Sequence, residues 1–157
     1  MAKKAIVECN PDEILALTLG LRKKEVVHQN SKGEVCNYHA KSDVNVAIID
    51  QDPGSAQPNY LKNFVLEEEK YETKKLINKK SGKIIIIICP RLEEWIIRQC
   101  NISKVNPALF FLPGEAKQLK VVINLKLKRF NELLQELKRK DNNGLKYLQS
   151  VLENCYK

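Results

Sequence analysis

Short apolar runs alternate with amphipathic segments through the first hundred residues of the chain. Four runs predict β-strands, because they consist largely of apolar, often β-branched residues and end at turn residues. These predicted strands span residues 3–9, 25–28, 44–50 and 84–89. The last is the clearest, with five consecutive isoleucines bounded by glycine and proline. Apolar residues on both faces of the third strand indicate a central parallel strand that is covered on both sides.

Helical periodicity is expected in five segments. They span residues 10–21, 60–80, 91–100, 118–140 and 145–155. The first has the best start signal, with Asn10 as a candidate N-cap and Pro11 at the first helical position. In the segment 60–80, Val65 and Leu76 fit extended strands as well as they fit a helix. The polar stretch 30–33 has turn or loop chemistry.

The alternation of strands and helices predicts an α/β architecture. We expect a central parallel sheet of about four strands flanked by helices, with right-handed crossovers. The sheet belongs to a predicted domain over residues 1–104, and residues 105–157 are expected to form a basic helical extension packed on it.

Composition narrows the class of protein further. The chain has 157 residues, is 43% hydrophobic and carries a formal net charge of +8. Its apolar runs are far shorter than the roughly 20 residues of a membrane span, and the N-terminus does not resemble a signal peptide. We therefore expect a cytoplasmic protein without a membrane partner. Its five cysteines are scattered and contain no CxxC pair, which favours reduced thiols over a zinc or redox site.

Acidic residues follow two of the predicted strands. Glu8 ends the first, and Asp50 and Asp52 end the third. Residues two apart in an extended chain point to the same side, so both aspartates are expected to converge with Glu8 at the carboxyl edge of the sheet. Gathered carboxylates repel one another unless a proton or cation holds them, and Mg²⁺ or Mn²⁺ is the natural cation. The alternative is that these acids are ordinary turn and cap residues.

At this point the chain resembles the TOPRIM superfamily. The segment VECNPDE at residues 7–13 is similar to its first motif, and IIDQDPG at 48–54 is similar to its second. HQNSKG at 28–33 and RLEEWI at 91–96 resemble further segments of small stand-alone TOPRIM-like proteins. Such proteins are often found beside ATPases in phage-defence loci. One departure is Cys9, where the family usually has glycine.

The resemblance implies an Mg²⁺-dependent nuclease or phosphoryl-transfer effector, with an ATPase as partner. It assigns catalytic roles to Glu8, Asp50, Asp52 and Glu93, and it assigns metal binding to Glu8, Asp50 and Asp52 with Asp12 as an accessory ligand.

The positive charge lies mainly in the second half of the chain. Residues 1–61 carry seven basic and eight acidic side chains, whereas residues 117–140 carry eight basic and two acidic ones. A polyanion such as DNA or RNA is the expected partner of this surplus, with contacts to phosphates rather than to bases. The candidate contact residues are Lys83, Arg91, Lys126, Lys128 and Arg129.

Two functions from different classes remain open. The first is the metal-dependent nuclease. The second is a non-catalytic module of the same fold, in which the acids are structural and the basic helix docks on nucleic acid or on a partner protein. The sequence leaves oligomerisation open.

Overall fold

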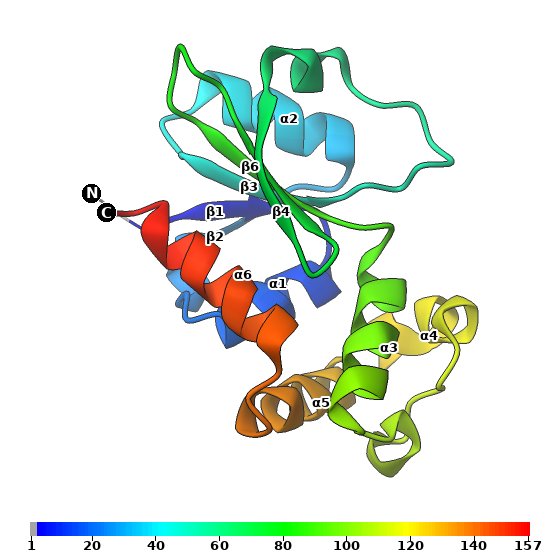
Figure 1. Ribbon diagram of the computed structural model, residues 1–157. Coiled ribbons are helices and arrows are strands. Elements are labelled where there is room, and N and C mark those ends of the chain that lie inside the picture. Colours follow the sequence, from blue (N-terminus) through cyan, green and yellow to red (C-terminus); the bar gives the residue numbers. More distant parts are fainter. Residues whose placement is uncertain (1–2) are drawn as a thin grey trace.

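The protein is an α/β protein built around one mixed β-sheet (Figure 1). The computed structural model describes residues 3–157. Within these residues the sheet has six strands in the order β2-β1-β3-β6-β5-β4. The strands are β1 (Ala5–Val7), β2 (Val26–His28), β3 (Val46–Asp50), β4 (Val65–Lys70), β5 (Thr73–Ile77) and β6 (Ile84–Ile88). β2, β1, β3 and β6 are parallel, whereas β5 and β4 are antiparallel.

Helices pack on both faces of the sheet. They are α1 (Asn10–Thr18), α2 (Lys32–Lys41), α3 (Leu92–Ser103), α4 (Ala116–Val122), α5 (Leu127–Arg139) and α6 (Asn143–Asn154). In Figure 1, α2 lies on one side of the sheet and α1 and α6 lie on the other. The predicted class, with strands covered on both faces, is therefore confirmed at the level of an α/β fold.

The isoleucine run of β6 contributes to two separate cores. Ile86 and Ile88 face the larger core, which α1, α3, α5 and α6 complete, while Ile85 and Ile87 face a smaller core under α2. Successive strand residues point to opposite faces, so five consecutive isoleucines supply both cores at once. This is why the central strands lack the alternation of a half-exposed strand.

The segment 60–80, predicted to be a helix, instead forms a 3-10 turn at Asn59–Asn63 followed by the β4–β5 hairpin. The sheet is therefore not the expected parallel sheet of four strands. β5 pairs with β6 over five residues, so β6 is an interior strand of the sheet and not an edge strand. Tyr71 and Glu72 form the hairpin turn, both with positive φ, and the Trp95 indole N–H donates to the Tyr71 carbonyl (2.8 Å). Lysine- and glutamate-rich sequence favours helix locally, but long-range pairing decides the outcome.

Two further expectations about helices are corrected. Residues 32–33 open α2 rather than lying in a loop, because Ser31 caps that helix by accepting a hydrogen bond from the backbone N–H of Glu34 (3.1 Å). The long helix expected over 118–140 is divided into α4 and α5 by a 3-10 turn at Ile123–Leu125. α4 packs on α3 whereas α5 packs on α1, so the chain changes direction between them.

The C-terminal helices complete the larger core rather than sitting outside it. Phe130, Leu134 and Leu137 of α5 and Leu148 of α6 are fully buried in the cluster that includes β1, β3 and β6. Residues 105–157 thus pack on the α/β layer as one body with it. Within the described residues, no helix combines the length and apolar character needed to cross a membrane.

The dependence of the fold on α5 is testable. Replacing Leu134 by alanine should lower the free energy of unfolding by about 3 kcal/mol, because it leaves a cavity in the shared core. Leu125→Ala, at a side chain that is 87% exposed, should change it by less than about 0.5 kcal/mol. Denaturant unfolding followed by circular dichroism measures both. Equal effects would contradict the placement of α5.

Candidate functional site

The carboxyl edge of the parallel strands brings together acids from four elements. Asp50 is the last residue of β3, which pairs in register with β6, and Glu8 follows β1 directly. Asp12 lies in the first turn of α1 and Glu93 in the first turn of α3. We call Glu8, Asp12, Asp50 and Glu93 the acidic cluster.

Asp12 is the most deeply buried member of the acidic cluster. Its side chain is 3% exposed, and the Cys9 thiol donates a hydrogen bond to its Oδ2 atom (3.1 Å). Its Oδ1 atom is buried without a hydrogen-bond partner. Burial raises the pKa of Asp12 well above its ordinary value, and the nearby charge of Asp50 raises it further. A carboxyl group in this state holds a proton unless a cation is present.

Asp50 shares these properties. Its Oδ1 atom is also buried and unpartnered. Burial raises the pKa of Asp50 to about 7, and the charges of Glu93 and Glu8 act in the same direction. The backbone N–H of Leu92 at the start of α3 opposes this shift by hydrogen bonding to the carboxylate. The charge of Asp50 therefore adds to the burial that disfavours ionisation of Asp12, and the charges of Glu8 and Glu93 act on both carboxyl groups.

Glu8 and Glu93 lie at the more open side of the cluster. Burial raises the pKa of both, and it is opposed at Glu8 chiefly by Lys32 and at Glu93 by Lys120 among the side chains. Each acid thus has a lysine nearby, so the rim of the cluster carries both negative and positive side chains.

Asp52 does not converge with Asp50 as the extended-chain assumption required. β3 ends at Asp50, and Asp52 has a φ of 45°, so the chain turns away from the strand. Its Oδ1 atom pairs with the Nε atom of Arg91 (3.0 Å). Hydrogen bonding to Ser55 and to Arg91 lowers the pKa of Asp52. Asp52 therefore lies at the lip of the site as a charged, paired residue.

Two hollows flank Asp52. The first, of about 530 Å³, is lined by Arg91, Glu93, Lys117 and Lys120 among others. The second, of about 490 Å³, is lined by Glu8, Lys32 and Gln57 among others. Each hollow combines a member of the acidic cluster with at least one basic side chain.

Lys32 is the site residue that the sequence analysis missed. Its ammonium group donates to the Gln51 carbonyl (2.9 Å) and to Oε1 of Gln57 (3.2 Å), which holds it beside the loop after β3. Reading residues 30–33 as a loop hid this lysine. The signal that identifies it is Ser31 followed three residues later by Glu34, the sequence pattern of a helix start.

The predicted basic residues divide into three groups. Arg91 is at the site and bridges Asp52 and Glu94. Lys83 is not beside the carboxylates as expected. It precedes β6, at the opposite edge of the sheet, and its ammonium group donates to carbonyls at the end of α2, including that of Ser42 (2.7 Å).

The remaining three predicted basic residues lie around the start of α5. Lys126 donates to the Phe111 carbonyl (2.6 Å), and the Arg129 guanidinium lies over the Phe111 ring at 4.5 Å. Lys128 is exposed. Lys117 and Lys120, which were not among the predicted contact residues, are the lysines that line the hollow at the acidic cluster.

In residues 3–157, no three histidine, cysteine or carboxylate side chains are already grouped so as to hold a metal ion. Comparison with protein-family models, with curated proteins and with solved structures yields no match.

The burial of Asp50 gives a testable pH dependence. Its native pKa of about 7 exceeds its ordinary value of 3.8, so the native state holds a proton that the unfolded state has released between these pH values. Stability of the metal-free protein should therefore fall as pH rises from about 4 to 7. Asp50→Asn removes this cost and should raise the free energy of unfolding at pH 8 by an amount of the order of 2 kcal/mol, with a smaller gain at pH 5.

Urea unfolding in the presence of a chelator at the two pH values measures the effect. Asp43→Asn, at an exposed aspartate, is the matched control and should change little at either pH. If Asp50→Asn is instead less stable than the wild type at pH 8, then the ionised Asp50 carboxylate does not destabilise the native protein.

Proposed function

We propose that the protein is a TOPRIM-like nuclease that hydrolyses phosphodiester bonds with the help of Mg²⁺ or Mn²⁺. The observation that carries the proposal is that Asp12 and Asp50 each have a buried oxygen that lacks a hydrogen-bond partner. Leaving such atoms without a partner is costly, and a hard cation removes both the missing contact and the repulsion. Glu8 and Glu93 stand beside the pair.

The donor chemistry fits a hard divalent cation. The unpartnered oxygens of Asp12 and Asp50 would hold it, with Glu8 as a further ligand. When bound, such a cation would polarise the phosphodiester and stabilise the charge that develops on it. Asp52 contributes differently from the family expectation, because its carboxylate is engaged by Arg91.

The remaining residues supply binding and proton transfer. Lys32 in one hollow and Arg91, Lys117 and Lys120 in the other offer cationic contacts to successive phosphates on either side of the acidic cluster. Glu93 lies beside these ligands and has a raised pKa, which suits a group that accepts a proton from an attacking water. The substrate is DNA or RNA contacted through its backbone.

The resemblance to TOPRIM-like proteins found beside ATPases extends this proposal to an ATPase partner in phage defence, in the cytoplasm. A second candidate function is the non-catalytic module of the same fold. The Asp52–Arg91 ion pair and the absence of three grouped ligands in the described residues favour it.

Metal binding and nicking discriminate between the two functions. Isothermal titration of the intact chain with Mn²⁺ at pH 8 should give saturable binding, which weakens at pH 6 because protons compete for the Asp12–Asp50 pair. Asp12→Asn and Asp50→Asn should each lower the affinity at least about tenfold. With Mg²⁺ or Mn²⁺, the wild type should nick supercoiled plasmid, and Asp50→Asn should do so at least about 100-fold more slowly.

Asp43→Asn is again the control and should bind Mn²⁺ and nick plasmid like the wild type. Metal binding without nicking would favour the non-catalytic module. If Mn²⁺ does not bind, or binds equally to Asp50→Asn, the metal site is placed wrongly.

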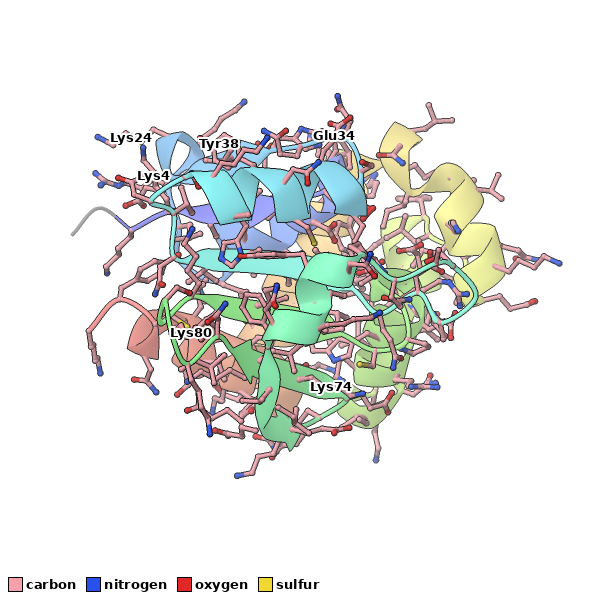
Figure 2. The ribbon with its side chains drawn as sticks, turned by 90° about the horizontal axis from the view of Figure 1, so that it is seen from above. Lys4, Lys24, Glu34, Tyr38, Lys74 and Lys80 are labelled. Carbon is pink, nitrogen blue, oxygen red and sulfur yellow. The ribbon has the colours of Figure 1, made fainter. Side chains whose placement is uncertain are left out.

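The role of the lysines at the hollow is tested separately by salt dependence. Lys117→Gln with Lys120→Gln should weaken binding to duplex DNA and reduce the slope of log K against log salt by about 2, because about 0.9 counterions are released per phosphate contact. Lys79→Gln with Lys80→Gln removes the same charge from the β5–β6 turn. Lys80 lies on the opposite side of the molecule from α4 (Figure 2). Fluorescence anisotropy at several salt concentrations should give a wild-type slope for this control, and equal slopes for the two double variants would contradict the assignment.

A further inference from the structure

Bulky apolar side chains are exposed in the segment that carries α4 and its flanking turns. Leu109, Phe111, Val121 and Leu125 are 74%, 63%, 76% and 87% exposed. We call these four residues the apolar protrusion. Side chains of this size that remain open to water to this extent mark a surface that contacts an apolar partner.

The two halves of the protrusion are joined by contacts of α5. Leu109 and Phe111 lie at the 3-10 turn Pro107–Phe110, while Val121 and Leu125 are one helical turn apart at the end of α4. Lys126, which follows Leu125, donates to the Phe111 carbonyl (2.6 Å). This bond holds the two turns side by side, and α4 lies at the periphery of the molecule (Figure 1).

Positive charge lies beside the apolar side chains. Lys126, Lys128 and Arg129 lie within four residues of Leu125, and the Arg129 guanidinium also pairs with Glu132 (3.4 Å). The Arg129 guanidinium lies over the exposed Phe111 ring at 4.5 Å. Lysine and arginine beside exposed leucine, valine and phenylalanine is the composition of surfaces that insert shallowly between lipid headgroups.

We propose that the apolar protrusion docks on the surface of a bilayer that contains anionic lipids. The basic side chains would contact the headgroups, and Leu109, Phe111, Val121 and Leu125 would enter the boundary of the acyl chains. This contact is peripheral and revises the expectation of a protein without a membrane partner. It is independent of the acidic cluster and of the proposed nuclease activity.

Charge and shape favour this occupant over others. A second copy of the chain would bring two surfaces of the same positive sign together. A nucleic acid would neutralise the lysines but leave the aliphatic side chains uncovered, since Phe111 is the one aromatic member of the protrusion. A protein partner would need separate pockets for side chains on different turns, together with carboxylates opposite the basic residues. A fluid anionic bilayer needs no fixed shape, because its acyl region accepts the apolar side chains and its headgroups carry the negative charge.

Vesicle binding tests the proposal directly. Flotation with vesicles of phosphatidylcholine containing about one third phosphatidylglycerol should recover the wild type at least about tenfold more efficiently than vesicles of phosphatidylcholine alone. Val121→Ser with Leu125→Ser should reduce that binding at least about tenfold without any change in charge. Val65→Ser with Leu66→Ser on β4, where the side chains are 46% and 53% exposed, is the matched control and should bind as the wild type does.

A fluorescent variant reports insertion as distinct from electrostatic contact. Leu125→Trp should show blue-shifted emission with the anionic vesicles and none with the neutral ones, while Trp95, which is fully buried, gives a constant background. Thermal melts of each variant confirm that it is folded. Absence of binding to anionic vesicles, or equal binding by the Val121→Ser/Leu125→Ser variant, overturns the proposal. It is also overturned if that variant loses binding to duplex DNA while the emission of Leu125→Trp is unaffected by vesicles.

Discussion

The in-register parallel pairing of β3 with β6 is the constraint on which the candidate site depends. It continues past the ends of the strands, because the backbone N–H of Gln51 donates to the Ile88 carbonyl (2.9 Å) and that of Asp52 donates to the Pro90 carbonyl (2.8 Å). The loop after β3 is thereby tied to the start of α3. This link places Asp50 against the first turn of α3 and Asp52 against Arg91. A shift of one residue in register would separate these groups and would also exchange the two faces of the isoleucine run.

The same architecture explains why ionisation of Asp12 and Asp50 is unfavourable in the folded protein. Strands covered on both faces remove water from the carboxyl edge, so Asp12 and Asp50 meet in a poorly solvated space. Cys9 modifies this balance. Its pKa is raised by burial and by the charge of Asp12, so the thiol keeps its proton and donates a hydrogen bond to Asp12. A glycine at this position would leave both oxygens of Asp12 without a partner. The cysteine therefore satisfies half of the carboxyl group and leaves Oδ1 for a proton or a cation.

Sequence reasoning succeeded where local chemistry and long-range structure agree. The isoleucine run of β6 and the Asn10–Pro11 start of α1 identify their elements because few other structures accept them, although Cys9 rather than Asn10 occupies the cap position. For the β4–β5 hairpin the sequence left extended segments open beside the favoured helix, because its lysines and glutamates favour helix locally. Its turn also uses Tyr71 and Glu72 instead of the asparagine and glycine that usually mark such turns. For the site, Glu8 and Asp50 follow from strand ends, but the outward turn of Asp52 and the position of Lys32 depend on contacts between loops that no periodicity encodes.

The structure also divides a charge surplus that the sequence presents as one feature. Lys117 and Lys120 face the hollow that contains Glu93, whereas Lys126 and Arg129 are engaged with Phe111. The 3-10 turn between α4 and α5 causes this separation, because it points the two helices at different neighbours, α3 and α1. A single straight helix over residues 118–140 would have presented its lysines along one solvated face. The break therefore turns a uniform basic stripe into two surfaces of different chemistry: one mixed with carboxylates at the edge of the sheet, and one mixed with apolar side chains at the periphery of the molecule.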